Sequence, residues 1–222
     1  MSQINPKNID ELLLLFVSTD EMRPKFMKPW REHDYVFASE THIIIRINGN
    51  LTETEYPAYD TPETNRLFPA GAPDGTVLFS DLEAVLAKAP MEDEMDGEDE
   101  EIKCEECDGE GTVTWDYKTW SREFDCPACN GRGYTGIRKA KPTGRKIIDS
   151  RAGVMVGPLK FSAFLLGLLL EAMRYCGCGQ ATATFGKKAA RFSLSDDIDI
   201  IIAPFCSYAE YYASIPLKQI IR

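Results

Sequence analysis

Two short cysteine motifs carry the clearest chemical signal in this chain. Residues 104–111 have the sequence CEECDGEG and residues 126–133 have the sequence CPACNGRG, so both fit the pattern C-x-x-C-x-G-x-G. Two intervening residues let a tight turn aim both sulfurs at one point, and the glycines let backbone N–H groups reach the thiolates. Two such motifs supply four sulfurs, which matches the tetrahedral coordination that structural Zn²⁺ prefers.

The two motifs therefore predict one structural zinc ion bound by Cys104, Cys107, Cys126 and Cys129. A site closed by four cysteines has no open coordination position, so the metal would stabilise a small fold rather than catalyse a reaction. Four thiolates also suit an iron–sulfur cluster, which remains the alternative metal centre.

The paired motifs resemble the cysteine-rich zinc domain of the DnaJ family of co-chaperones over residues 104–133. In that family four such motifs bind two zinc ions, so two motifs imply one ion here. The His-Pro-Asp signature of the family's J-domain is absent, and the nearest match is His33-Asp34-Tyr35. The resemblance thus implies a protein-interaction adaptor that binds peptide or chaperone partners, without stimulation of a chaperone ATPase.

The segment between the motifs, residues 112–125, alternates aromatic and polar residues. This alternation predicts a β-hairpin that turns near Lys118. So small a hairpin cannot bury its aromatic residues internally, so we expect some of Trp115, Tyr117, Trp120, Phe124 and Tyr134 to be exposed or to dock on something. Trp115, Tyr117 and Trp120 are the candidates for contact with a partner. The rings could dock on the rest of the protein, stack on unpaired bases or hold an apolar peptide.

Charge is distributed very unevenly along the chain. The 25 basic and 35 acidic side chains give a net charge of −10, which argues against indiscriminate binding to nucleic acid or anionic lipid. Residues 92–110 hold twelve acidic and one basic side chain, whereas residues 132–151 hold seven basic and one acidic. We expect residues 91–101 to form a solvated acidic linker and residues 138–146 to form a basic linker.

The basic linker supplies the best candidates for contact with phosphate groups. These residues are Arg138, Lys139, Lys141, Arg145 and Lys146. The alternative is that they are solvated charges that balance the acidic run.

The flanking sequences predict two halves of one α+β domain, residues 1–90 and 139–222, with a zinc-binding hairpin inserted at residues 102–138. Apolar periodicity and caps predict three helices, at residues 8–17, 80–88 and 159–174. The second helix would begin with a capping box of Ser80 and Glu83. Runs of β-branched residues predict strands at residues 35–48 (two strands around a turn), 76–79, 146–156, 180–185, 189–194 and 199–203. The tail, residues 207–222, gives no clear signal.

The body also resembles one domain of a DNA sliding clamp, the polymerase processivity factor. The resemblance is carried by RAGVMVGPLKFSAFLLGLLL (151–170), ATATFGKKAARFSLSDDIDIIIAPF (181–205) and YVFASETHIIIRI (35–47). It implies a helix-plus-antiparallel-strand unit used twice, with DNA or a replication protein as partner. It also implies a homo-oligomer, since one domain does not close a ring. Clamp helices present lysine and arginine to DNA, whereas the expected helix at residues 8–17 carries Asp10 and Glu11.

No catalytic motif is evident, because the sequence contains no P-loop, no H-E-x-x-H and no G-x-S-x-G. We therefore expect a non-enzymatic zinc-binding module associated with DNA or replication, with the adaptor as the alternative. No signal peptide or membrane span is apparent, so we expect a cytoplasmic protein. Cys176 and Cys178 are expected to be small buried side chains at a strand start, with a redox pair or extra metal ligands as the alternatives. Cys206 has no assigned partner.

Overall fold

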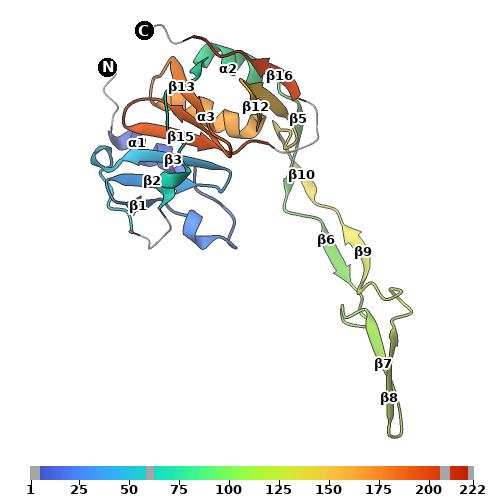
Figure 1. The fold of residues 1–222 in the computed structure, drawn as a ribbon. Helices are drawn as coiled ribbons and strands as arrows, with labels where there is room; N and C mark the ends of the chain where they lie inside the picture. Colours follow the sequence, from blue (N-terminus) through green and yellow to red (C-terminus); the bar gives the residue numbers. More distant parts are fainter. Residues whose placement is uncertain (1–5, 59–62, 206–210, 220–222) are drawn as a thin grey trace. The chain divides into compact units, whose positions relative to one another are not determined.

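The computed structural model describes residues 6–58, 63–205 and 211–219, which belong to two compact units (Figure 1). Unit 1 comprises Met1–Pro90 and Ile148–Arg222, and unit 2 comprises Met91–Ile147. Unit 2 thus interrupts unit 1 in the sequence, with wider bounds than the expected insertion at residues 102–138. Among the helices in the described ranges, none is both long enough and apolar enough to cross a membrane.

Unit 1 is built on a seven-stranded sheet in which every neighbouring pair is antiparallel. The strand order is β1-β2-β3-β15-β14-β13-β4. The strands are β1 (Trp30–Glu32), β2 (Tyr35–Ser39), β3 (Ile43–Asn48), β4 (Gly75–Leu78), β13 (Gln180–Phe185), β14 (Ala190–Ser193) and β15 (Ile198–Ile202). Because β3 pairs with β15 and β4 with β13, the two halves of the sequence form one domain.

A smaller sheet and three helices complete unit 1. The sheet has the order β12-β11-β16, and β11 pairs in parallel with β16. Its strands are β11 (Gly153–Val156), β12 (Leu159–Ser162) and β16 (Tyr211–Ile215). The helices are α1 (Pro6–Leu14), α2 (Phe79–Leu86) and α3 (Ala163–Tyr175), with short 3₁₀ turns η1 (Pro24–Phe26), η2 (Gly49–Leu51) and η3 (Thr64–Leu67).

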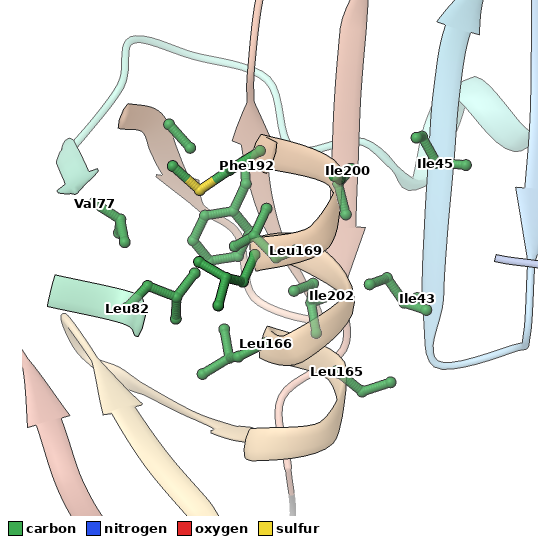
Figure 2. Close-up of a cluster of buried hydrophobic side chains, with 14 of the residues drawn as sticks. Ile43, Ile45, Val77, Leu82, Leu165, Leu166, Leu169, Phe192, Ile200 and Ile202 are labelled. Carbon is green, nitrogen blue, oxygen red and sulfur yellow. The ribbon is translucent and has the colours of Figure 1, made fainter. Parts of the chain in front are cut away.

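The core of unit 1 lies between helix α3 and one face of the large sheet (Figure 2). The isoleucines at alternate positions of β3 stand opposite those of β15, in the pairs Ile43–Ile202, Ile45–Ile200 and Ile47–Ile198. All six are fully buried. Leucines 165, 166 and 169 of α3 are buried in the same cluster. Alternation of period two in the strands therefore directs one apolar row toward the helix.

The other face of the sheet carries a second buried cluster, formed by Trp30, Phe37, Phe68 and Ile201. Both faces of β15 are therefore covered, and all five of its residues are buried.

Arg46 and Asp199 form an ion pair on the face of the sheet that carries this second cluster. An Arg46 N–H donates to an Asp199 carboxylate oxygen at 2.5 Å. The Arg46 guanidinium also lies 4.8 Å from the centre of the Tyr35 ring and 4.2 Å from that of Phe68. The pair joins β3 to β15 across 153 positions of sequence.

Unit 2 consists of three two-stranded ladders, of which the inner two are antiparallel, and each pair of strands is flanked in sequence by the previous pair. β5 (Met91–Asp96) pairs with β10 (Lys141–Ile148), β6 (Glu100–Lys103) with β9 (Tyr134–Arg138), and β7 (Thr112–Tyr117) with β8 (Trp120–Asp125). The chain leaves and re-enters unit 1 at neighbouring points, because the Asp149 N–H donates to the Pro90 carbonyl at 2.9 Å.

The expected acidic and basic linkers are wrong, because both segments are strands that pair with each other. An Arg138 N–H donates to Glu100 at 3.0 Å, and Lys146 pairs with Asp93 at 2.7 Å. Opposite charges on facing strands stabilise the pairing. Taken alone, each of the two charged segments has no local partner for its charges. The oppositely charged segment that neutralises it lies about forty residues away in sequence.

Three smaller expectations also differ from the structure. The expected helix at residues 159–174 begins four residues later, because residues 159–162 form strand β12 against β11. The expected capping box of Ser80 and Glu83 is wrong, since α2 begins at Phe79 and the cap residue Leu78 makes no side-chain hydrogen bond. Strands β1 and β16 were not expected; residues 207–210 and 220–222 of the tail lie outside the described residues.

Candidate metal centre

The four cysteines of the two motifs form one buried cluster within unit 2. Their Sγ atoms all lie within 4.8 Å of one another, with Cys104–Cys126 and Cys107–Cys129 both at 3.8 Å. A tetrahedron of sulfurs about 2.3 Å from a zinc ion has edges of about 3.8 Å. The sulfurs are too far apart for a disulfide bond of about 2.05 Å. The donor set and its spacing therefore fit one tetrahedral metal ion.

Backbone hydrogen bonds join the two motifs reciprocally. The Cys104 N–H donates to the Gly133 carbonyl at 2.9 Å, and the Cys126 N–H donates to the Gly111 carbonyl at 2.8 Å. Each motif thus begins with a bond to the last glycine of the other. The centre is therefore assembled from both motifs together.

Two glycines are required where the motifs approach each other. Gly111 and Gly133 have φ values of +81° and +79°, a conformation that side chains disfavour. A Cβ at Gly111 would lie 2.6 Å from the Gly131 carbonyl oxygen, and one at Gly133 would lie 2.5 Å from that of Gly109. The last glycine of the C-x-x-C-x-G-x-G pattern is therefore fixed by backbone contact with the other motif.

Backbone N–H groups also point at the sulfurs. The Gly111 N–H donates to Cys107 Sγ at 3.2 Å, and the Gly133 N–H donates to Cys129 Sγ at 3.3 Å. Such bonds stabilise a thiolate over a thiol. They are the contacts that a metal-bound thiolate requires from its surroundings.

The thiol pKa values show why a cation suits this cluster. Burial raises the pKa of Cys104 to about 11. Burial also acts to raise the pKa of Cys129, but hydrogen bonds from the Gly133 N–H and from neighbouring thiols outweigh it and bring that pKa to about 7. Four thiolates this close would repel one another strongly, and a divalent cation removes that repulsion. All four buried sulfurs face one point, so the centre can hold structure but offers no free position for a substrate.

The β7–β8 hairpin lies between the two motifs in the sequence and has one aromatic side. In its register Val113 stands opposite Phe124, Trp115 opposite Arg122, and Tyr117 opposite Trp120. Side chains of such facing pairs, two residues apart along a strand, lie on the same side of the ladder. We call these six residues the aromatic face. Trp115, Tyr117 and Trp120 are 75%, 68% and 78% exposed.

The basic residues expected to contact phosphate lie elsewhere in unit 2, on or beside β9 and β10. Arg138, Lys139 and Lys146 form ion pairs with Glu100, Asp99 and Asp93, respectively. The hydrogen bond from Lys139 lowers the pKa of the Asp99 carboxyl below its usual value. Lys141 and Arg145 are exposed on β10. Three of the five expected contacts are thus engaged with acidic partners.

Phe124 is exposed, as the sequence predicts for some of the rings of this segment. Arg122 was not among the expected contact residues, and the period-two alternation together with the register places it on the same side.

The remaining described cysteines are two residues apart after helix α3. Cys176 is buried, and burial raises its pKa to about 12. Cys178 donates weakly to the carbonyls of Cys176 and Leu194. The pair is therefore composed of protonated, largely shielded thiols. Cys206 lies outside the described residues.

Comparisons with known proteins identify structural neighbours but no family. No family model matches the chain, and no curated protein matches it. Solved structures that match include the DNA polymerase sliding clamp of Bacillus subtilis, with a TM-score of 0.48 and 11% identity over 91% of this chain and 62% of the clamp. The DnaN sliding clamp of Bartonella birtlesii bound to griselimycin matches with a TM-score of 0.47 and 12% identity over 91% of this chain and 64% of the clamp. The beta subunit of DNA polymerase III from Thermotoga maritima matches with a TM-score of 0.46 and 9% identity over 92% of this chain and 65% of the subunit.

The structural neighbours are thus sliding clamps, the class that the body resembles in sequence. The chain spans less than two thirds of the length of each of these clamps. With TM-scores below 0.5, these likenesses do not establish a family or a function.

Proposed function

We propose that this chain is a non-enzymatic binding protein whose unit 2 is folded around one structural zinc ion. In this proposal unit 1 is the scaffold, and the β7–β8 hairpin contacts the partner, which we take to be DNA. The observation that carries the proposal is the buried set of four sulfurs, all within 4.8 Å of one another and with two edges of 3.8 Å. The metal would supply the folding energy that three narrow ladders lack.

The sulfur spacing favours a single ion over an iron–sulfur cluster. A cluster binds its cysteines through different iron atoms, which holds their sulfurs farther apart than the edges of a one-ion tetrahedron. Between single ions, zinc is the usual occupant of a closed four-cysteine site.

Metal analysis of the purified full chain tests the proposal. Protein prepared without chelators should contain about one zinc per chain and little iron. Cys104→Ser should lose the metal, whereas Cys176→Ala, which removes a buried thiol outside the cluster, should keep it. Less than half a zinc per wild-type chain would refute the proposal.

A second candidate function is a protein-interaction adaptor. The observation in its favour is the charge of unit 2, in which residues 91–147 hold fifteen acidic and nine basic side chains. This excess repels the phosphate backbone of DNA. DNA binding that weakens as salt rises would support the first candidate, and its absence in zinc-loaded protein would favour the adaptor.

We extend the proposal to a replication-associated homo-oligomer, in line with the resemblance of the body sequence. One domain cannot encircle DNA, so a ring would require a stable assembly of several copies. Light scattering of the full chain over a range of concentrations tests this part. A strict monomer would remove the ring and leave the zinc-folded binding unit in place.

A further inference from the structure

The aromatic face meets the metal centre at Val113, which packs against the four cysteines, and its aromatic members extend from there into solvent. Phe124 is 47% exposed, and its three larger aromatic neighbours are exposed by two thirds or more. Isolated exposed apolar side chains are ordinary, but a contiguous exposed patch marks a surface that binds something.

Charge is separated between the two sides of the hairpin. The aromatic face contains Arg122 and no carboxylate, and Lys118 lies in the adjoining turn. Asp116, Glu123 and Asp125 belong to the opposite side. The aromatic face is therefore the side that an anion can approach, although unit 2 as a whole is acidic.

The two cations lie against aromatic rings. The Arg122 guanidinium is 5.3 Å from the centre of the Phe124 ring, and the Lys118 ammonium is 5.4 Å from that of Tyr117. A cation held beside a ring can contact a phosphate while the neighbouring ring stacks on a base.

A shallow hollow at the base of the hairpin extends this surface. It has a volume of about 360 Å³ and is lined by Val113, Trp115, Phe124, Asp125 and Pro127. Its walls are mostly apolar, so a planar base can pack against them, and Asp125 reaches it from the opposite side of the ladder.

We propose that the aromatic face binds single-stranded nucleic acid. Unpaired bases stack on Trp115, Tyr117 and Trp120, while Arg122 and Lys118 contact the phosphates. Rings two residues apart on a strand are separated by about 7 Å, so each ring is free to take its own base. The proposal rests on the proposed function only in requiring a folded, zinc-loaded unit 2.

The same surface suits an apolar peptide and a duplex less well. An apolar peptide would leave Arg122 and Lys118 beside the rings without an anionic partner, whereas the phosphates of a nucleic acid supply one. A duplex offers no unstacked bases to the rings, and its dense phosphate charge meets the acidic remainder of unit 2. Selection for single strands therefore follows from the separation of charge on the hairpin.

Fluorescence titration of the zinc-loaded full chain tests this proposal with labelled oligo(dT) and oligo(rU) of about 12 nucleotides. Binding should quench the emission of the exposed tryptophans. A duplex of the same length should bind at least about tenfold more weakly. With two phosphate contacts, the logarithm of the binding constant should fall with the logarithm of salt concentration with a slope of about −1.4. Preference for one oligonucleotide identifies DNA or RNA as the source, and binding of either supports the proposal.

Variants on the two sides of the hairpin provide the matched control. Trp120→Ala and Trp115→Ala should each weaken oligonucleotide binding by about 5- to 150-fold. Thr114→Ala, on the opposite side of the same strand, should leave it unchanged. Zinc content is measured in every sample, so loss of metal from the wild type counts against the proposed function instead. The proposal is overturned if zinc-loaded protein binds no oligonucleotide, binds the duplex equally well, or binds unchanged after both tryptophan substitutions.

Discussion

The sharpest prediction concerns Gly111, where the two cysteine motifs meet. Gly111→Ala introduces two separate costs. The left-handed backbone, with φ +81°, costs about 1–2 kcal/mol for an L side chain. The new Cβ would also lie 2.6 Å from the Gly131 carbonyl oxygen, and overpacking of this kind costs about 1–3 kcal/mol.

Gly109 in the same motif separates these two costs. Its φ is +90°, but a Cβ there would meet only the Lys103 side chain, at 3.4 Å. Gly109→Ala therefore carries the backbone cost without the collision. Because such a centre folds only as it binds the metal, a substitution that destabilises the fold also weakens metal binding, so both substitutions should lower the zinc affinity. We expect a loss of about 5- to 30-fold for Gly109→Ala, and a further loss of about 5- to 150-fold for Gly111→Ala.

Competition with a chromophoric chelator at constant pH measures both affinities. Gly133→Ala should reproduce the result at the symmetry-related contact, where the Cβ would lie 2.5 Å from the Gly109 carbonyl oxygen. Equal affinities for the Gly109 and Gly111 variants would show that the contact between the motifs does not determine metal binding.

Three further predictions concern the stability of unit 1. Replacement of residues 91–147 by a short Gly/Ser linker should leave a cooperative thermal transition in calorimetry, because the main core belongs to unit 1; loss of the transition would contradict this. Arg46→Ala should lower the free energy of unfolding in urea by about 3 kcal/mol, since it leaves Asp199 buried without its charge partner. The loss should be much smaller in an Asp199→Ala background. Burial raises the pKa of Cys176 from 9.0 to about 12, so the folded state holds this proton and loses stability as pH rises through that window. Cys176→Ala should flatten the decline of unfolding free energy over that window, and an unchanged slope would refute the assignment.

The sequence predicted those elements whose structure is decided by residues close together in the chain. The strand at residues 180–185 has the predicted bounds, and the turn between β2 and β3 falls where expected. The cysteine spacing alone identified the four sulfurs that the structure brings together. In each case the residues that decide the structure are near neighbours in sequence or repeat one motif.

The expectations that failed depend on partners far away in sequence. Glu100 would be repelled within its own acidic run, and becomes part of a strand because Arg138 faces it. Asp199 lies in an isoleucine-rich strand, and its burial is explained by Arg46 on β3 and by the Ser193 hydroxyl on β14, which donate to its two carboxylate oxygens. No periodicity within either segment contains that information. The hairpin is the opposite case, because the alternation within residues 112–125 already separates its two sides and the register only pairs them.

The hydrogen bond between Asp149 and Pro90 has a consequence for how the chain folds. Strands on either side of the insertion must find each other, and closing a long flexible loop costs entropy before any contact repays it. Once the β5–β10 ladder forms, its two ends are neighbours, so the insertion behaves as a tight turn in the conformational search of unit 1. Metal binding by unit 2 would then lower the effective contact order of unit 1, because it brings the two ends of the insertion together. Zinc would thereby act as a kinetic aid to folding of a unit that contains none of its ligands.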